Sequence, residues 1–452
     1  MNIKDDFILS QINEGYLVGG TLRDFLLGKK SVDRDIAIKN AEDFAKKIAN
    51  EFEATFIVLD SVNKIFRVVL KDKINYLDIS EMQGDNIEKD LERRDFTMNA
   101  VAFDLKTCEI IDPFNGVLDI KNKKIKHIKD INFEEDPLRI LRAFRFVATT
   151  GFELSEEVQV CINKYKNLLL NPAKERIMYE LMKLFGGNYT SKSLLMMDRF
   201  GILEEIFPQV VEMKKIPPNT HHHLDLFHHV VETVRNIEVL YENSCDEIKS
   251  HLEQVDFGGF PRLNHLKMSG FLHDIGKYST WTIEESGRHR FIKHNDVGAK
   301  MCEPFLKDLK FSKKQIDYIS LMIKNHIYPS NVVASPELSE KIMMRYVRKM
   351  DKDVIDNIIL AKSDRLSALG EAITEEIVKK NIEGLDKLLN FYLAKKDTLK
   401  PLPKLLDGRE VMKILEIGQG PKLGEILTLL KEAQISGDVT NKEEAIEFLK
   451  KI

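Results

Sequence analysis

Strand-like segments occur only in the first part of this chain, which limits the size of any β-sheet it can form. Short β-branched or aromatic runs lie at 56–59, 66–70, 76–79, 101–103 and 110–111. Between them, residues 41–52 place Phe44, Ile48 and Phe52 at helical spacing. From about residue 134 onward, amphipathic helical patterns dominate. We therefore predict an α+β domain with a small mixed sheet, followed by all-α domains.

Proline-containing breaks divide the helical part. One lies at Pro217 and Pro218, before a block rich in histidine, and another lies at 400–403, before a tail with a glycine-rich turn at 418–421. The 452 residues leave room for several domains. The 68 lysines and arginines nearly balance the 72 aspartates and glutamates, so any nucleic acid would have to bind a local basic face.

The cysteines and the apolar runs indicate a cytoplasmic protein. Cys108, Cys161, Cys245 and Cys302 are far apart and have neither disulfide nor zinc-thiolate spacing. The N-terminal residues lack the pattern of a signal peptide. Because no run approaches 18 apolar residues, we expect no membrane span.

Two glycines follow the first short apolar segment and begin a predicted helix. In YLVGGTLRDFLLG, residues 16–28, Gly19 and Gly20 precede Arg23 and Asp24. Paired glycines let the backbone approach a ligand, and a helix N-terminus offers N–H groups to phosphate. Arg23 can add a charged fork. A tight strand–helix turn without a ligand has the same pattern.

Two aspartates lie at strand spacing shortly afterwards. Asp33 and Asp35 in DRDIAI would share one face of a strand, about 7 Å apart. Such a pair suits Mg²⁺ with substrate phosphates, and two ions can activate a hydroxyl and steady a leaving pyrophosphate. Asp78, in YLDIS, is our candidate for a third carboxylate. A solvated strand edge is the alternative for the pair, and more strongly for Asp78 alone.

Residues 93–100, RRDFTMNA, form a third polar segment. Arg93, Arg94, Asp95 and Asn99 have the chemistry to bind a triphosphate and a ribose hydroxyl. A surface salt-bridge cluster would have the same composition.

Residues 135–146, EDPLRILRAFRF, predict a helix with Glu135 and Asp136 at its start, Pro137 in its first turn and Arg139 beside Asp136. Ionised aspartate only accepts hydrogen bonds and arginine only donates them. The pair therefore fits the donor–acceptor edge shared by cytosine and adenine, and leaves polar groups unpaired against guanine or uracil. An ordinary intrahelical salt bridge is the alternative.

Together these segments closely resemble the bacterial-type (class II) tRNA nucleotidyltransferase and poly(A) polymerase family. The matches, in the family's order, are GGTLRD at 19–24, DRD at 33–35, RRDFTMNA at 93–100, IDPFNGVLDI at 111–120, EDPLR at 135–139 and ERIMYE at 175–180. The resemblance implies a nucleotidyltransferase head at 1–133 and a helical neck at 134–215. It also implies Mg²⁺ on Asp33 and Asp35, and tRNA, CTP and ATP as partners.

The resemblance further implies roles for single residues. Its implied nucleotide-binding residues are Gly19, Gly20, Arg23, Asp24, Arg93, Arg94, Asp95, Asn99, Glu135, Asp136, Arg139 and Arg142. Asp136 and Arg139 would select the base, and Glu135 would orient Arg139. The segment at 175–180 would be a neck helix that positions the selecting residues.

One segment departs from the family's pattern. From Asp78 to Arg93 the chain is shorter than in many members that add all three nucleotides, and some short-loop members add only CC. We therefore expect addition of all or part of CCA. Poly(A) polymerases share the same core, so that activity is an alternative.

The histidine-rich region contains a candidate metal-ligand set. His229, His273, Asp274 and Asp364 lie on predicted helices that can converge on one ion, either a divalent transition metal or Mg²⁺. The ordered set resembles the HD phosphohydrolase superfamily, over a predicted domain at 216–385. The additional histidines of members with a second metal or phosphate are matched by His294 and His326.

Each of these histidines, taken alone, is more typical of a packed or surface residue. The neighbouring His222 and His223 receive no assignment. A phosphohydrolase with an inactive head, and a domain that serves only as a scaffold, are the alternatives.

Two further segments are candidates for RNA contact. Lys121, Lys123, Lys124, Lys126 and Lys129 form a basic run, although a solvated hairpin has the same pattern. A helical tail is predicted at 386–452, and its segment 405–450 resembles the last helical module of family members with an HD domain. Its Gly-Pro turn would present N–H groups to tRNA phosphates.

Overall fold

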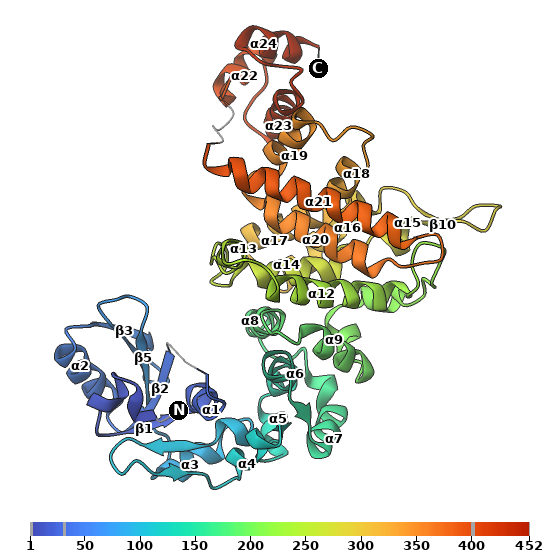
Figure 1. Ribbon diagram of the computed structural model, residues 1–452. Coiled ribbons are helices and arrows are strands. Elements are labelled where there is room, and N and C mark those ends of the chain that lie inside the picture. Colours follow the sequence, from blue (N-terminus) through green and yellow to red (C-terminus); the bar gives the residue numbers. More distant parts are fainter. Residues whose placement is uncertain (1–2, 30–32, 399–402, 452) are drawn as a thin grey trace. The chain divides into compact units, whose positions relative to one another are not determined.

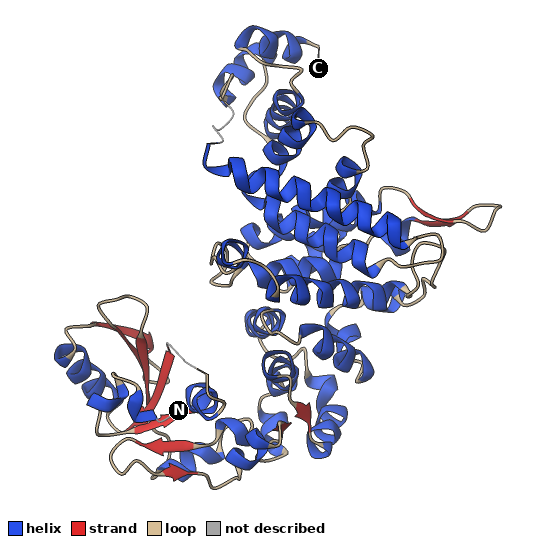
Figure 2. Ribbon diagram, viewed as in Figure 1, coloured by secondary structure: helices blue, strands red, loops and turns tan. Residues whose placement is uncertain are grey.

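The computed structural model describes the whole chain except residues 1–2, 30–32, 399–402 and 452 (Figure 1). The chain forms two compact units, Met1–Pro208 and Gln209–Ile452. The predicted α+β head followed by helical domains is confirmed (Figure 2). The four domain boundaries remain predictions, and the break at 400–403 falls largely outside the described residues. Within the described part, no helix has the length and apolar character needed to cross a membrane.

A mixed sheet of seven strands, in the order β3-β4-β5-β2-β1-β6-β7, forms the first part of the N-terminal unit. Its strands are β1 (Tyr16–Val18), β2 (Asp33–Ile38), β3 (Thr55–Asp60), β4 (Ile65–Val69), β5 (Tyr76–Glu81), β6 (Ala102–Asp104) and β7 (Ile110–Ile111). Strands β2 and β5 are parallel, and the other neighbours are antiparallel. All five strand-like runs of the sequence lie in this sheet.

The two faces of the sheet differ because side chains alternate along each strand. Ile36 and Ile79 point into a core beneath helices α1 (Gly19–Leu26) and α2 (Ala41–Glu51), the latter predicted at 41–52. The opposite face carries Asp35 and Asp78. Helix α3 (Ile87–Glu92) contributes to a smaller core that also includes Ala37 of β2.

Helices make up the rest of the N-terminal unit. They are α4 (Gly116–Lys121), α5 (Ile131–Glu135), α6 (Leu138–Thr150), α7 (Glu156–Tyr165), α8 (Lys174–Phe185), α9 (Thr190–Arg199) and α10 (Ile202–Ile206), with the short strands β8 (Lys124–Ile125) and β9 (Glu153–Leu154). The predicted start of α6 at Glu135 and Asp136 was slightly early: this helix begins at Leu138, and Pro137 already has helical backbone angles. Glu135 ends α5, and Asp136 is extended because Pro137 disfavours helical backbone at the residue before it.

The described residues of the second unit are helical apart from loops and one hairpin. Its helices are α11 (Gln209–Met213), α12 (Leu226–Glu242), α13 (Asp246–Leu252), α14 (Arg262–Leu272), α15 (Lys277–Thr280), α16 (His294–Asp308), α17 (Lys313–Asn325), α18 (Tyr328–Val333), α19 (Glu340–Met350), α20 (Val354–Ser367), α21 (Glu375–Lys395), α22 (Gly408–Leu415), α23 (Pro421–Ser436) and α24 (Lys442–Lys450). The hairpin, β10 (Trp281–Ile283) and β11 (His289–Phe291), was not predicted. Helices α22 to α24 share a separate small core.

Gly116, at the start of α4, provides a test of the head packing. A Cβ atom there would lie 2.1 Å from the carbonyl oxygen of Thr97 and 2.6 Å from Val101. We expect Gly116→Ala to lower the free energy of unfolding of the N-terminal unit by about 1–3 kcal/mol through overpacking. Urea unfolding followed by far-UV circular dichroism measures this loss.

Two internal controls accompany this measurement. Gly424→Ala, in α23, meets no atom within 4 Å and should not destabilise the protein. The fluorescence of Trp281, the only tryptophan, reports on the C-terminal unit and should keep its midpoint. An unchanged N-terminal transition in Gly116→Ala would contradict the packing described for this turn.

Candidate active site and candidate metal centre

Three carboxylates gather on the open face of the head sheet. The parallel pairing of β2 and β5 sets Asp35 opposite Asp78, and Asp33 lies two residues before Asp35 on the same face. Oxygen atoms of the three side chains lie within 4.8 Å of one another. The structure thus brings together the two aspartates predicted from DRDIAI and the proposed third carboxylate.

The electrostatics of this cluster fit a cation. Burial, together with the charges of Asp35 and Asp78, raises the pKa of Asp33 to about 6. Burial and the charge of Asp78 also raise the pKa of Asp35. Both shifts mean that burial and mutual repulsion destabilise the ionised forms of these side chains. Mg²⁺, which prefers carboxylate oxygens, would relieve this repulsion, so the residues present fit the ion.

Helix α1 begins directly against the carboxylates. Gly19 has a φ of +69°, and a Cβ atom there would lie 3.2 Å from Asp35 Oδ2 and 3.4 Å from Arg94 Nη1. Glycine is therefore favoured both by the backbone conformation and by the space available. The Thr21 hydroxyl donates to the backbone carbonyl of Asp33, 3.1 Å away, and also lies 3.2 Å from Asp35 Oδ2. This threonine was not among the predicted site residues.

Asp78 has a partner that sequence reasoning missed. Arg67 of β4 donates from Nε and Nη2 to the two oxygens of Asp78, each at 2.7 Å. Arg67 lies opposite Asp78 in the antiparallel pairing of β4 and β5. Strand alternation alone would have placed Arg67 on the correct face, but only the register shows that it meets Asp78.

A hydrogen-bonded chain connects α1 to the RRDFTMNA segment. Asp24 accepts from Arg23 Nη2 at 2.9 Å, and Arg23 Nη1 donates to Asn99 Oδ1 at 3.1 Å. Asn99 Nδ2 in turn donates to Asp95 at 3.0 Å. Asp24 therefore holds Arg23 in place.

The series of hydrogen bonds continues from Asp95 to helices α6 and α8. Arg142 of α6 donates from Nε to Asp95 at 2.8 Å and from Nη1 to Glu180 of α8 at 3.0 Å. Burial alone would raise the pKa of Asp95, but Arg142 and Asn99 outweigh it and hold that pKa at about 2. Glu180 also accepts from Arg145 at 3.2 Å. The segment at 175–180 thus positions Arg142, and through it Asp95.

The two arginines before Asp95 have different surroundings. Arg94 is paired with the buried Asp90 at 2.9 Å and borders Gly19. Arg93 is exposed, and its closest approach to Asp90 is 3.6 Å. Of the two, only Arg94 lies against the start of α1.

The proposed base-selecting residues are held separately. Asp136 pairs with Arg176 of α8 at 2.8 Å. Arg139 Nη2 donates to the carbonyl of Arg93 at 3.0 Å, and its buried Nη1 has no hydrogen-bond partner within the described chain. Glu135 is exposed, and among the described residues no hydrogen bond joins it to Arg139. The backbone carbonyl of Arg93 orients Arg139 instead.

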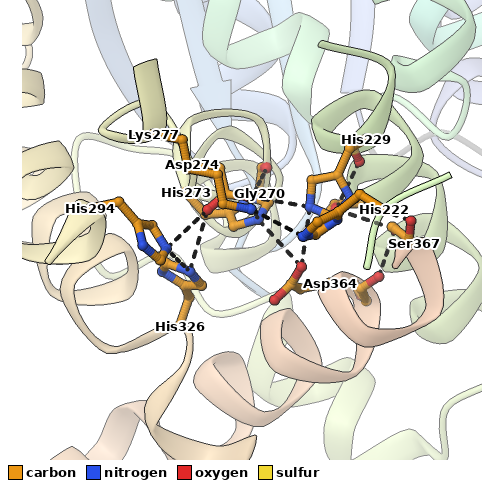
Figure 3. Close-up of polar contacts among 12 residues, drawn as sticks. His222, His229, Gly270, His273, Asp274, Lys277, His294, His326, Asp364 and Ser367 are labelled. Atoms are coloured by element: carbon orange, nitrogen blue, oxygen red, sulfur yellow. Dashed lines mark hydrogen bonds and ion pairs between the residues drawn. The ribbon is translucent and has the colours of Figure 1, made fainter. Parts of the chain in front are cut away.

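The second candidate site lies among helices of the C-terminal unit. His229 of α12, Asp364 of α20, and His273 and Asp274 just after α14 offer ligand atoms within 4.8 Å of one another (Figure 3). His229 Nε2 lies 3.3 Å from Asp274 and 3.2 Å from Asp364. The structure therefore brings together all four residues predicted as HD ligands.

Asp274 also faces a second group. His294 and His326 offer ligand atoms within 4.8 Å of those of Asp274, and the two Nε2 atoms lie 3.2 Å apart. Asp274 Oδ1 faces this pair, whereas Oδ2 faces His229 and His273 (Figure 3). One carboxylate thus lies between two sets of ligands, as in a site for two ions.

The histidine rings are oriented as metal ligands are. In His229, His273, His294 and His326, Nδ1 lies 2.7–3.3 Å from a backbone carbonyl. In a neutral ring this contact fixes the proton on Nδ1 and leaves the lone pair on Nε2. The Nε2 atoms of His229 and His273 are buried without a hydrogen bond in the described chain. A cation between them and the carboxylates satisfies both, so these residues fit a divalent metal.

Two more residues border this cluster. Lys277 Nζ lies 2.6 Å from Asp274 Oδ2 and 3.3 Å from His222 Nε2. The His222 ring packs edge-on against His229, with centroids 4.6 Å apart. No role was predicted for His222, because only the fold brings it, from the segment before α12, next to Lys277 at the start of α15.

The basic run of the head is partly neutralised. Lys124 pairs with Glu153, Lys126 with Glu157 and Lys129 with Glu92. This pattern agrees better with a solvated, salt-bridged surface than with a free basic face. RNA contact by the run remains a prediction.

Comparison with known families gives three matches along the chain. The Poly A polymerase head domain matches residues 15–126, the Probable RNA and SrmB- binding site of polymerase A matches 151–213, and the HD domain matches 226–369. Their order agrees with the resemblance seen in the sequence, and they include most of both candidate sites.

Two curated relatives align over nearly their full length. The chain is 29% identical to an A-adding tRNA nucleotidyltransferase of Deinococcus radiodurans, over 96% of this chain and 94% of the relative. It is 28% identical to a CC-adding tRNA nucleotidyltransferase of Thermus thermophilus, over 98% and 95%. The crystal structure of the Bacillus stearothermophilus CCA-adding enzyme in complex with CTP has a TM-score of 0.55 at 22% identity, covering 98% of this chain and 95% of that one. This structural likeness supports the fold.

The ligand geometry around Asp274 predicts a bound divalent metal. We expect the purified protein to carry at least one such ion in the C-terminal unit, and His273→Ala to lower the metal content, because it removes a buried nitrogen ligand. Elemental analysis by mass spectrometry measures the stoichiometry. His228→Ala, at the exposed neighbour of His229, is the matched control and should retain the metal. Equal metal content in wild type and His273→Ala would refute the site.

Proposed function

We propose that this chain, which belongs to the bacterial-type tRNA nucleotidyltransferase and poly(A) polymerase family and carries an HD domain, is a tRNA nucleotidyltransferase. It adds all or part of CCA to the 3′ end of tRNA from CTP and ATP, without a nucleic-acid template, and releases pyrophosphate. The carboxylate cluster beside the start of α1 is the observation that carries this proposal. A cytoplasmic location fits the four free cysteines.

The head residues have two roles in the reaction, which are metal binding and phosphate binding. Mg²⁺ held by Asp33 and Asp35 would activate the attacking 3′-hydroxyl and neutralise charge on the leaving pyrophosphate. The N–H groups at Gly19 and Gly20 bind the nucleotide's phosphates at the positive end of α1. Arg94, next to Gly19, adds positive charge at the same place.

The neck residues select the base. Arg139 presents an unpaired buried donor, and Asp136 presents acceptor oxygens held by Arg176. Cytosine and adenine satisfy both groups, whereas guanine and uracil would leave the buried donor of Arg139 unpaired. The hydrogen bonds of Arg142 to Asp95 and to Glu180 hold helices α6 and α8 in a fixed position relative to the RRDFTMNA segment.

Nucleotide addition to three tRNA transcripts tests the proposal. The transcripts end before CCA, after the first C, and after CC, and each is incubated with Mg²⁺ and with single or mixed nucleotides. We expect extension of at least one transcript by C or A only, stopping at CCA, because the site matches two bases and no others. Gel electrophoresis at single-nucleotide resolution measures the products.

Each pattern has a defined meaning. Extension of all three transcripts to CCA assigns a complete CCA-adding enzyme, a stop at CC assigns a CC-adding enzyme, and extension only from CC assigns an A-adding enzyme. Long A tails would instead indicate a poly(A) polymerase. Failure to extend any transcript would contradict the proposal.

We propose a second activity, metal-dependent phosphoester hydrolysis, at the HD cluster. The position of Asp274 between two ligand sets favours it, because paired ions can bind a phosphate and activate water. We expect Mn²⁺-loaded protein to hydrolyse 2′,3′-cyclic AMP, and His273→Ala to lose this activity while His228→Ala keeps it. Release of nucleoside monophosphate, followed by chromatography, measures it. No hydrolysis of cyclic, mono- or diester substrates with any divalent metal would contradict this activity.

A further inference from the structure

A row of side chains crosses three neighbouring strands of the head at the carboxylate cluster. Arg67 of β4 lies opposite Asp78 of β5, and Asp78 lies opposite Asp35 of β2. All three share the open face of the sheet. Arg67 is therefore separated from the catalytic carboxylate Asp35 by a single side chain.

The guanidinium of Arg67 is fixed by hydrogen bonds to Asp78, but one of its nitrogen atoms has no hydrogen-bond partner in the described chain. Its Nε and Nη2 atoms donate to Asp78 at 2.7 Å, and its guanidinium lies 4.0 Å from the centre of the Tyr76 ring. Its Nη1 makes no hydrogen bond within the described part of the chain, and its side chain is 31% exposed. Arg67 thus keeps a donor and a charge directed to solvent beside the reacting centre.

The surface beside Arg67 is apolar and aromatic. Ile57 of β3 lies opposite Arg67 and is 41% exposed. Tyr76 is partly exposed on the other side of the guanidinium. A positive charge flanked by an aromatic ring and an apolar side chain suits a single-stranded nucleic-acid end, whose phosphate and base need both kinds of contact.

The in-line geometry of phosphoryl transfer indicates which substrate lies beside Arg67. The glycines that would receive the triphosphate follow β1, on one side of Asp35, whereas Arg67 lies beyond Asp78 on the other side. In phosphoryl transfer the attacking and leaving oxygens are roughly in line across the phosphorus. The attacking 3′-hydroxyl therefore approaches from the side opposite the pyrophosphate, which is the side of Arg67.

We infer that Arg67, with Tyr76 and Ile57, receives the 3′-terminal nucleotide of the tRNA. The guanidinium binds the phosphate of that nucleotide, and the ring and the isoleucine contact its sugar and base. Asp78 fixes the guanidinium in position. This inference rests on the proposed tRNA nucleotidyltransferase function and assigns the acceptor side of the same site.

Steady-state kinetics of Arg67→Ala separates this role from a purely structural one. We expect the KM for tRNA to rise by about ten- to hundredfold, as is typical when a charged hydrogen bond is lost, and the KM for the nucleotide to stay unchanged. Equilibrium binding of tRNA, measured by filter retention without nucleotide, should weaken in parallel. The slope of log Kd against log salt should fall by about one, since one phosphate contact is lost.

Matched variants complete the test. Lys71→Ala, which removes an exposed lysine paired with Glu53 just after β4, should behave as wild type. Arg67→Gln keeps a polar side chain but removes the charge, and should show the same change in salt slope as Arg67→Ala. Far-UV circular dichroism checks the fold of each variant, and Arg67→Gln decides the question if Arg67→Ala does not fold.

The contrary results are distinct. Two results would overturn the inference, provided that wild type adds nucleotides. One is an Arg67 variant that raises the KM for CTP or ATP as much as that for tRNA. The other is an Arg67 variant that leaves tRNA binding and its salt slope unchanged. If wild type itself adds no nucleotide, the proposed function fails instead.

Discussion

Parallel pairing of β2 and β5 brings Asp35 and Asp78 face to face, and the head is arranged around the resulting negative charge. Burial, together with repulsion from the neighbouring carboxylates, raises the pKa of Asp33. Three residues border these carboxylates. Gly19 leaves space at the start of α1, the Thr21 hydroxyl lies 3.2 Å from Asp35 Oδ2, and Arg67 donates two hydrogen bonds to Asp78. In the proposed function, a cation held by these carboxylates would in turn attract a polyphosphate of opposite charge.

Asp274 in the C-terminal unit is also a buried carboxylate, and the side chains that face it are histidines. Backbone carbonyls bind the Nδ1 atoms of His229 and His273 and leave both Nε2 atoms facing the carboxylates. Such rings cannot satisfy one another by hydrogen bonding, so a metal ion is the simplest partner for them. One chain therefore carries two candidate cation centres, each built around a cluster of carboxylates.

Much of this arrangement could be predicted from the sequence. Strand alternation placed Asp33 and Asp35 on one face, and the order of His229, His273, Asp274 and Asp364 anticipated their convergence. The contacts that the sequence could not give depend on register between distant elements. Arg67 meets Asp78 only through the β4–β5 pairing, and Glu180 meets Arg142 only through the packing of α8 on α6. The start of α6 was placed too early because Glu135 and Asp136 were assigned to it, whereas Pro137 disfavours helical backbone at Asp136.

The central claim is that nucleotide addition occurs at the head carboxylates and not at the HD cluster. The most direct test is Asp35→Asn, which keeps the shape of the side chain but removes a charge that would hold the metal. The account predicts a folded protein that retains the metal of its C-terminal unit yet adds no nucleotide to any tRNA transcript that the wild type extends. Addition by Asp35→Asn at a rate close to that of wild type would contradict the account, and would mean that the head is not the working site.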